Sequence, residues 1–453
     1  MPMSVIKFFK ISLSCLLIFT FILFGTVHSS ALPDIPASNA EESVYFWNAE
    51  YDKVIINRSA TEKIYPASTT KIMTGLVAID LIGDRLDQEL ILTSEMLLGK
   101  NGTSMQLKAG DTLTYRDLLY GAICGGFNDA ANALAAASAG SISAFVSKMN
   151  EKAKSLGALD THYTNPTGWH SDLMVTTLYD TSIIAKAAMK NELYVTVSSA
   201  TSYTVLYKNS SDKFTVHNRN GLIASHYSYG YYNKRAKGLI AGMTDEGGYC
   251  VATFAEYDDL TYLCIVMGGK EENGVISSYD IANSLISYAI SYYGELEVIE
   301  EGDTVAKVPL RYALYSKSGS NDEDGDQYIL KCTVPYDIKI LAPYDNDSLA
   351  TLELKPYFIE ENISAPVKEG EIVGGVDIFI DGICRGSAPL CASETVDASS
   401  FLLMMENAKN LLLSRVFLIF ILTFIILFAI YFYRTELKSL RKKHKNIKFD
   451  KLY

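Results

Sequence analysis

The sequence predicts an α/β (α+β) domain in which helices flank an antiparallel sheet and a helical subdomain is inserted. A small all-β domain and a C-terminal transmembrane helix follow it. Hairpin patterns lie near both ends of the first 294 residues, with helical patterns between them, and short alternating strands follow Gly294. In the 18-residue run Val416 to Tyr433, Thr423 is the only clearly polar member. That length is enough for a membrane span.

The two ends of the chain predict where the protein resides. Lys7 and Lys10 precede an apolar run and the small residues before Ala31, a pattern typical of a secretory signal peptide over residues 1–31. At the other end, residues 434–453 hold eight Lys or Arg against two acidic residues. Positive charge beside a span marks its cytoplasmic side. We therefore expect a single-pass cell-membrane protein with its ectodomain outside and its C-terminal tail in the cytoplasm.

Charge and cysteine content exclude several function classes. The chain carries −12 and the tail +6, so the remainder carries −18, which disfavours nucleic acid as a partner. The six cysteines after the signal peptide form no C-x-x-C, and the histidines are scattered. We expect no metal site and no cofactor. Free buried thiols are the favoured interpretation of these cysteines, and a disulfide between Cys384 and Cys391 is the alternative.

The first domain is predicted over residues 42–294. It begins with a hairpin within residues 43–58 that turns at Tyr51-Asp52. Short strands are predicted in the loop-rich region that comes next, at Glu89–Leu92 and Ser104–Leu107. The helices predicted from apolar periodicity are Tyr115–Cys124, Asp129–Ser138, Ile142–Leu156 and Thr177–Met189. The later elements are strands Tyr203–Tyr207 and Phe214–His217, the hairpin Tyr249–Phe254 with Tyr262–Met267, and the closing helix Tyr279–Tyr292.

The second domain is predicted over residues 297–395. Its strands are short and alternating, for example Tyr328–Cys332 and Val376–Ile380. An acidic loop at Ser318–Asp326 is expected to be disordered. A helix over 399–413 is then expected to lead into the membrane span, residues 414–433.

The chemistry is predicted to centre on Pro66-Ala67-Ser68-Thr69-Thr70-Lys71. Pro66 suits the first turn of a helix, so Ser68 and Lys71 would share one helical face, one turn apart. A hydroxyl beside an amine, at the positive end of a helix dipole, can form an activated nucleophile. Serine-x-x-lysine is a motif of penicillin-binding proteins and class A β-lactamases. Because so short a motif is common by chance, its meaning depends on the motifs later in the chain.

With its later motifs, the chain resembles low-molecular-mass penicillin-binding proteins of the D-alanyl-D-alanine carboxypeptidase type. The matching segments are Pro66–Lys71, Leu107–Asp111, Asn128–Leu134, Asn165–Gly168, Tyr179-Asp180, Asn218 with Asn220, and Thr244–Cys250. The resemblance implies a β-lactamase/transpeptidase-like fold. It also implies a peptidoglycan stem peptide ending in D-Ala-D-Ala as substrate and β-lactam antibiotics as ligands.

The resemblance also implies roles for individual residues. Ser68 would attack the D-Ala-D-Ala amide, Lys71 would act as its base, and water would later release the acyl-enzyme. Asn128 is the retained polar residue of the second motif. The oxyanion hole would use the backbone amides of Ser68 and of the strand near Met243.

Two motifs depart from the family pattern. Where the family has Ser-x-Asn, this chain has Gly126-Phe127-Asn128, and where it has Lys-Thr-Gly, this chain has Ile240-Ala241-Gly242. Removing the buried cation that pairs with the substrate carboxylate costs about 3–5 kcal/mol of free energy, because the carboxylate is then buried without a partner. Lys71 also loses a like charge that would lower its pKa from a reference near 10.4. Lys237 could replace the missing cation only through an odd register shift, which would turn its side chain to the other face.

Two hypotheses of different class therefore remain. One is a slow or altered carboxypeptidase, favoured by Ser68, Lys71 and Asn128, and the other is a non-catalytic peptidoglycan-binding or scaffolding homologue. For Cys124 a buried structural role is favoured over a reactive thiol. For His170 a structural role is favoured over that of a replacement base, since nothing in the sequence places it near Ser68.

Overall fold

The structure, a computed structural model, describes residues 34–36, 40–99, 101–227, 230–314, 328–343, 351–380 and 382–449. The chain divides into two compact units, Met1–Glu295 with Leu341–Ser348 and Leu296–Ile340 with Leu349–Tyr453. The predicted signal peptide and the predicted acidic loop Ser318–Asp326 lie outside the described residues, as do the last four residues of the tail.

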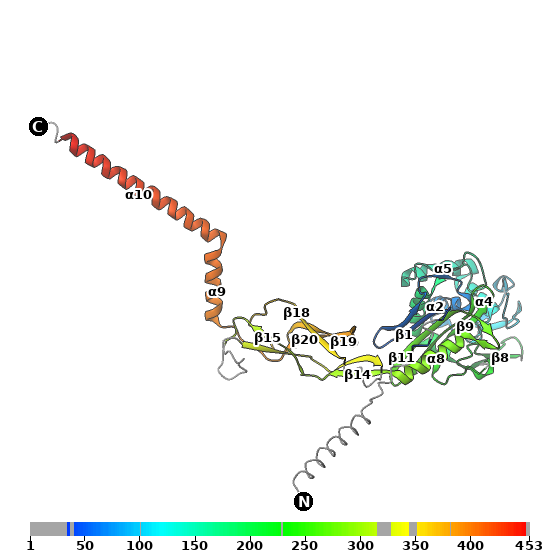
Figure 1. Ribbon diagram of the computed structural model, residues 1–453. Coiled ribbons are helices and arrows are strands. Elements are labelled where there is room, and N and C mark those ends of the chain that lie inside the picture. The colour runs from blue at the N-terminus through cyan, green and yellow to red at the C-terminus, as the bar shows by residue number, and fades with distance from the viewer. Residues whose placement is uncertain are drawn as a thin grey trace, which may run out of the picture. The chain divides into compact units, whose positions relative to one another are not determined.

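A five-stranded antiparallel sheet forms the centre of the first unit (Figure 1). Its strand order is β2-β1-β11-β10-β9, with bounds β1 Ser43–Asn48, β2 Lys53–Arg58, β9 Ala236–Thr244, β10 Gly248–Tyr257 and β11 Leu260–Gly269. Asp258 and Asp259 join β10 to β11 with φ of +52° and +62°, as a two-residue type I′ turn requires. Both predicted hairpins are confirmed.

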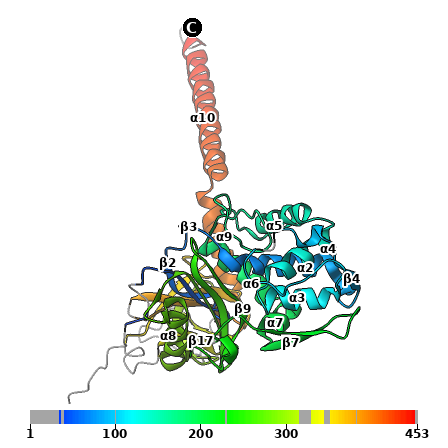
Figure 2. The same cartoon turned by 90° about the vertical axis from the view of Figure 1, so that its right-hand side faces the viewer.

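Each face of this sheet is buried under helices. Val44 and Phe46 of β1 pack with helix α8 (Ser277–Tyr292), whereas Tyr45 and Trp47 pack on the other face with the helical subdomain. The alternation is the period of two expected of a strand buried on both faces. Figure 2 shows α8 on one side of the strands and the helical subdomain on the other.

The helical subdomain confirms the helices expected between the hairpins and adds one. Its members are α2 (Thr70–Ile82), α3 (Tyr115–Ile123), α4 (Asn128–Ala139), α5 (Ile142–Leu156), α6 (Leu178–Met189) and the unpredicted α7 (Glu192–Ser199). Short paired strands border it: β3 (Lys63–Ile64) with β6 (Thr176–Thr177), β4 (Glu89–Ile91) with β5 (Thr112–Thr114), and β7 (Ser202–Leu206) with β8 (Lys213–His217). A further pair, β12 (Glu271–Glu272) with β13 (Val275–Ile276), precedes α8.

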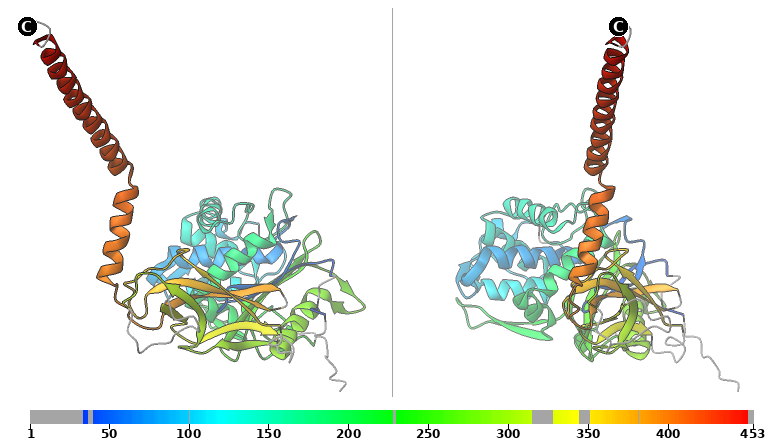
Figure 3. Two further views of the ribbon diagram at one scale, coloured as in Figure 1. Left: turned by 60° about the vertical axis from the view of Figure 1, so that its left-hand side comes forward. Right: turned by 90° about the vertical axis from the view of Figure 1, so that its left-hand side faces the viewer.

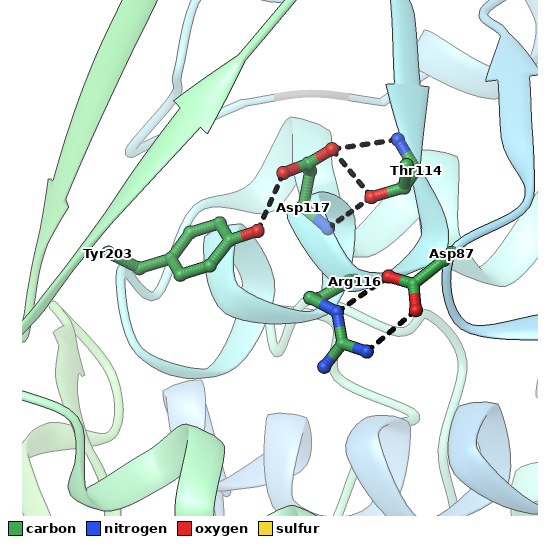
Figure 4. Close-up of polar contacts among 5 residues, drawn as sticks. All are labelled: Asp87, Thr114, Arg116, Asp117 and Tyr203. Atoms are coloured by element: carbon green, nitrogen blue, oxygen red, sulfur yellow. Dashed lines mark hydrogen bonds and ion pairs between the residues drawn. The ribbon is translucent and has the colours of Figure 1, made fainter.

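Helix α3 is fixed at its start by a capping box (Figure 4). Thr114 Oγ1 accepts from the Asp117 amide at 3.1 Å, and Asp117 Oδ2 accepts from the Thr114 amide at 2.8 Å. Tyr203 of β7 donates to the same carboxylate at 2.9 Å, and Arg116 makes a two-point ion pair with Asp87. These contacts satisfy helix donors that would otherwise lack partners. They fix the helix that ends just before the Gly126 turn.

The strand predicted at Ser104–Leu107 is wrong. No strand forms there because this segment bonds to one buried side chain instead of a neighbouring strand. The Asp129 carboxylate accepts from the amides of Met105 and Leu107, both at 3.0 Å, and from Ser104 Oγ at 2.6 Å. Gln106 has φ of +62°, a value incompatible with a regular strand.

The second unit contains an antiparallel sheet with strand order β15-β16-β20-β19-β18. The bounds are β15 Thr304–Leu310, β16 Tyr328–Thr333, β18 Glu353–Phe358, β19 Ile372–Ile380 and β20 Ile383–Ala392. Strands β14 (Tyr293–Ile299) and β17 (Ile338–Pro343) form a separate pair. Cys384 and Cys391 lie seven residues apart on β20, about 23 Å of extended chain, so they cannot form the disulfide that the sequence left open.

Two helices follow the second sheet. Figure 3 shows α9 (Ser400–Leu413) in orange leading into α10 (Arg415–Phe449) in red. Within α10, Arg415–Leu440 is long and apolar enough to cross a membrane, and none of its most apolar window is buried in the protein. The helix continues through the predicted span into the basic tail.

Removing the Asp129 carboxylate is expected to destabilise the first unit. Asp129→Ala would leave the buried amides of Met105 and Leu107 without their acceptor. At about 1–3 kcal/mol for each unsatisfied donor, the free energy of unfolding should fall by about 2–6 kcal/mol. Denaturant unfolding of soluble residues 32–410 measures it. Ser104→Ala, the control, should cost about 1 kcal/mol, and an equal or smaller loss in Asp129→Ala would contradict the prediction.

Candidate active site

Ser68 and Lys71 meet at the wall of a cavity of about 430 Å³. A short 3₁₀ turn, η1 (Ala67–Thr69), places Ser68 on the cavity wall, and α2 begins directly after it. Lys71 is completely buried, and its Nζ donates to Ser68 Oγ at 3.3 Å. The two side chains thus have the proximity that their spacing predicted.

The Lys71 amine has a second partner, which holds it in place. Its Nζ donates to the Thr167 carbonyl at 2.6 Å. Burial lowers the pKa of Lys71 to about 7, and the positive charge of Arg219 adds to the effect. A substantial fraction of the amine is therefore neutral near pH 7 and able to accept a proton. Burial supplies most of the depression that we had expected a second cation to provide.

The Asn165–Gly168 segment is a turn that packs directly on the Ser68 region. Asn165 Oδ1 accepts from the amides of Thr167 and Gly168 at 3.1 and 2.9 Å. Gly168 has φ of +79°, and a Cβ there would lie 1.8 Å from the Ala67 carbonyl oxygen. Only glycine fits this position. The turn also aims the Thr167 carbonyl at Lys71, so its role here is to position the amine.

The second motif keeps its amide and lacks its hydroxyl. Asn128 begins α4, lines the cavity and donates from Nδ2 to the Asn101 carbonyl at 2.5 Å. Gly126 also lines the cavity and has φ of +66°, a conformation that disfavours serine. The backbone at Gly126 therefore suits glycine better than serine.

The third motif keeps its close approach to Ser68. A Cβ on Gly242 would lie 2.4 Å from both Cβ and Oγ of Ser68, so glycine is required there. Ala241 lines the cavity beside it. Ile240 is 2% exposed and packs in the core under the helical subdomain. Among the described residues that line the cavity, neither Ile240 nor a lysine on β9 is present.

Two other candidates from the sequence do not line the cavity. Lys237 forms an ion pair with Glu256 of β10, so this candidate replacement cation lies elsewhere. His170 contacts Asp172 at 3.2 Å and meets the Tyr65 ring edge-on at 4.7 Å, contacts that suit a structural role. Burial raises the pKa of the Cys124 thiol to about 12, which keeps it protonated and unreactive.

A cation that does line the cavity, Arg219, was not among the residues predicted from the sequence. The signal was present, since Arg219 lies between Asn218 and Asn220, both of which matched the family. Trp169 and Glu271 also line the cavity and were not singled out, whereas Tyr249, another lining residue, lies in the matching segment Thr244–Cys250. None of these residue types is diagnostic in a sequence, because only the fold brings them together.

An antiparallel sheet flanked by helices, with a serine-x-x-lysine pair at a cavity, defines the class of penicillin-binding proteins and serine β-lactamases. A family model described as D-alanyl-D-alanine carboxypeptidase matches residues 30–271. The match covers more than half of the chain, which therefore belongs to this family.

Individual relatives support the same assignment. The chain is 29% identical to D-alanyl-D-alanine carboxypeptidase DacF of Bacillus subtilis, over 79% of this chain and 86% of DacF. It is 28% identical to DacC of Escherichia coli, over 77% of this chain and 82% of DacC. The crystal structure of DacD from Francisella tularensis superposes with a TM-score of 0.61 at 22% identity, covering 83% of this chain and 99% of DacD. That superposition confirms the predicted fold.

The pH dependence of Ser68 acylation should report the Lys71 amine. Only the neutral amine can accept the serine proton, and its pKa is about 7. The rate of labelling by a fluorescent penicillin should therefore rise with pH, reach half its maximum near pH 7 and level off above. His170→Gln is the control and should leave the midpoint unchanged. A midpoint that shifts in that variant would contradict the assignment of the titration to Lys71.

Proposed function

We propose that this protein is a membrane-anchored serine D-alanyl-D-alanine carboxypeptidase acting on the stem peptides of peptidoglycan. The observation that supports this most is the Ser68 hydroxyl 3.3 Å from the buried amine of Lys71, on the wall of a cavity. The family to which the chain belongs supplies the substrate class.

In the proposed mechanism, Lys71 takes the proton of Ser68 as Oγ attacks the carbonyl of the penultimate D-alanine. The amides of Ser68 and Met243 stabilise the oxyanion. Lys71 returns the proton to the departing amine of the terminal D-alanine, which leaves as the amide bond breaks. Water then attacks the ester carbonyl while Lys71 accepts a proton from it. Lys71 passes this proton to Ser68 Oγ as the ester C–O bond breaks, which releases the shortened peptide and restores Ser68. Asn128 binds the backbone of the stem peptide.

The altered motifs favour a slow enzyme and sustain a second candidate. Gly126 brings no hydroxyl for proton relay, and Ile240 places an apolar side chain in the core where the family has a lysine. These losses favour the alternative, a non-catalytic peptidoglycan-binding homologue that has kept the fold. The buried, neutralisable Lys71 favours the enzyme, because a binding protein would not need an activated serine.

Labelling and turnover by soluble residues 32–410 separate the two candidates. We expect covalent labelling by fluorescent penicillin and release of D-alanine from diacetyl-L-Lys-D-Ala-D-Ala. Ser68→Ala should abolish labelling, and both Ser68→Ala and Lys71→Met should reduce release by at least about 10³-fold, as expected when members of one catalytic unit are removed. Folded wild-type protein that binds the peptide with no label and no release would support the binding homologue.

The proposed topology follows from α10 and the basic residues after it. Protease added to intact protoplasts should remove residues 32–410 and leave the C-terminal tail protected. An epitope fused after Tyr453 should survive this treatment and be lost once the membrane is permeabilised. Loss of the epitope from intact protoplasts would place the tail outside and reverse the orientation.

A further inference from the structure

The charges at the cavity wall indicate where an anionic ligand would bind. Of the described residues that line the cavity, Arg219 and Glu271 carry the formal charges, and Lys71 lies buried beneath the wall. Glu271 accepts a hydrogen bond from Tyr249 OH at 2.6 Å. The terminal carboxylate of a peptide entering this cavity would therefore be attracted to Arg219 and repelled by Glu271.

The backbone on both sides of Arg219 is fixed by buried asparagines. Asn218 Nδ2 donates to the carbonyls of Ser198 and Ala200, both at 2.8 Å. Asn220 Nδ2 donates to the Gly238 carbonyl at 3.2 Å, and the Arg219 amide donates to the Cys124 carbonyl at 3.0 Å. The backbone at Arg219 is thus held between the end of α3, which comes just before Gly126, and strand β9, which bears the altered third motif.

Arg219 also lies beside the position where the second motif has lost its side chain. A Cβ on Gly126 would meet Cγ of Arg219 at 3.4 Å and its Cβ at 3.7 Å. The aliphatic stem of the arginine therefore packs along the face from which a serine side chain would project. The guanidinium is also close enough for its charge to act on Lys71.

We propose that Arg219 binds the terminal carboxylate of the stem peptide and replaces the cation that the third motif lacks. This inference rests on the proposed substrate class. A guanidinium presents two parallel N–H groups to a carboxylate, a geometry that a lysine amine does not reproduce. The cation at the cavity is thus supplied by the segment after β8. Strand β9 supplies no cation there, and its role is the close approach of its backbone to Ser68.

The test compares diacetyl-L-Lys-D-Ala-D-Ala with the same peptide ending in a carboxamide. The variants are Arg219→Met, Arg219→Lys and the control Lys237→Met, whose lysine pairs with Glu256 outside the cavity. All rates are measured near pH 9, where Lys71 is neutral, so that an effect of Arg219 through Lys71 does not interfere. Thermal melts confirm that each variant is folded.

Arg219→Met should lower kcat/KM for the carboxylate peptide by about 10- to 100-fold, the loss expected for a charge-assisted contact. The same variant should change kcat/KM for the carboxamide by less than about 3-fold, a residual allowance for indirect effects. For the carboxylate peptide, kcat/KM of Arg219→Lys should lie between the values of wild type and Arg219→Met, and kcat/KM of Lys237→Met should equal that of wild type. Equal losses on both peptides, or no loss on either, would overturn the proposal.

Binding to Ser68→Ala protein keeps this test independent of turnover. In that background the carboxylate peptide should bind more tightly than the carboxamide, and Arg219→Met should remove the difference. If wild type releases no D-alanine and this preference is still present, the proposed catalysis fails and the Arg219 assignment holds. Equal affinities for the two peptides, or no measurable binding of either, would overturn the Arg219 assignment.

Discussion

The burial of Lys71 beside Ser68 is the constraint on which the site depends. A buried amine needs partners, and the Thr167 carbonyl supplies one only because the Asn165–Gly168 turn packs on the Ser68 turn. That contact requires glycine at 168, and the approach of β9 from the other side requires glycine at 242. Segments about 100 and 170 residues beyond Ser68 must therefore converge on it for the amine to be held.

The altered motifs keep their backbone positions at the site but lack their polar side chains. Gly242 still approaches Ser68 closely, and Asn128 still lines the cavity, so the walls of the site are retained. The polar lining is the part that has changed, with no hydroxyl at Gly126 and an apolar residue at Ile240. A cavity can keep its shape when such groups are lost, because close packing fixes the shape and hydrogen bonds fix the specificity.

The sequence predicted the elements whose pattern is local, and missed those set by distant partners. Both hairpins and the long helices follow from alternation and apolar period. The error at Ser104–Leu107 arose because a buried carboxylate on α4, Asp129, captures amides that a strand would pair. Ser68 and Lys71 could be found because one helical turn joins them. Arg219 was missed although it lies between Asn218 and Asn220, since only the bonds to the residue that caps α3 and to β9 place it at the cavity.

The fraction of neutral Lys71 and the free-energy cost of the lost contacts together decide whether the altered motifs must abolish catalysis. At a reference pKa near 10.4, about one lysine in 2,500 is neutral at pH 7, whereas near a pKa of 7 about half are. That difference of about 10³-fold in reactive amine comes mainly from burial, which the altered motifs do not remove. A missing hydroxyl contact costs about 1–3 kcal/mol, or about 5- to 150-fold, and a missing buried cation costs about 3–5 kcal/mol, or about 150- to 5,000-fold. Activation of the serine is therefore larger than the first loss and comparable to the second, and it is retained. The altered motifs weaken the binding of the substrate. Substrate binding is also the step on which Arg219, at the cavity wall, would act.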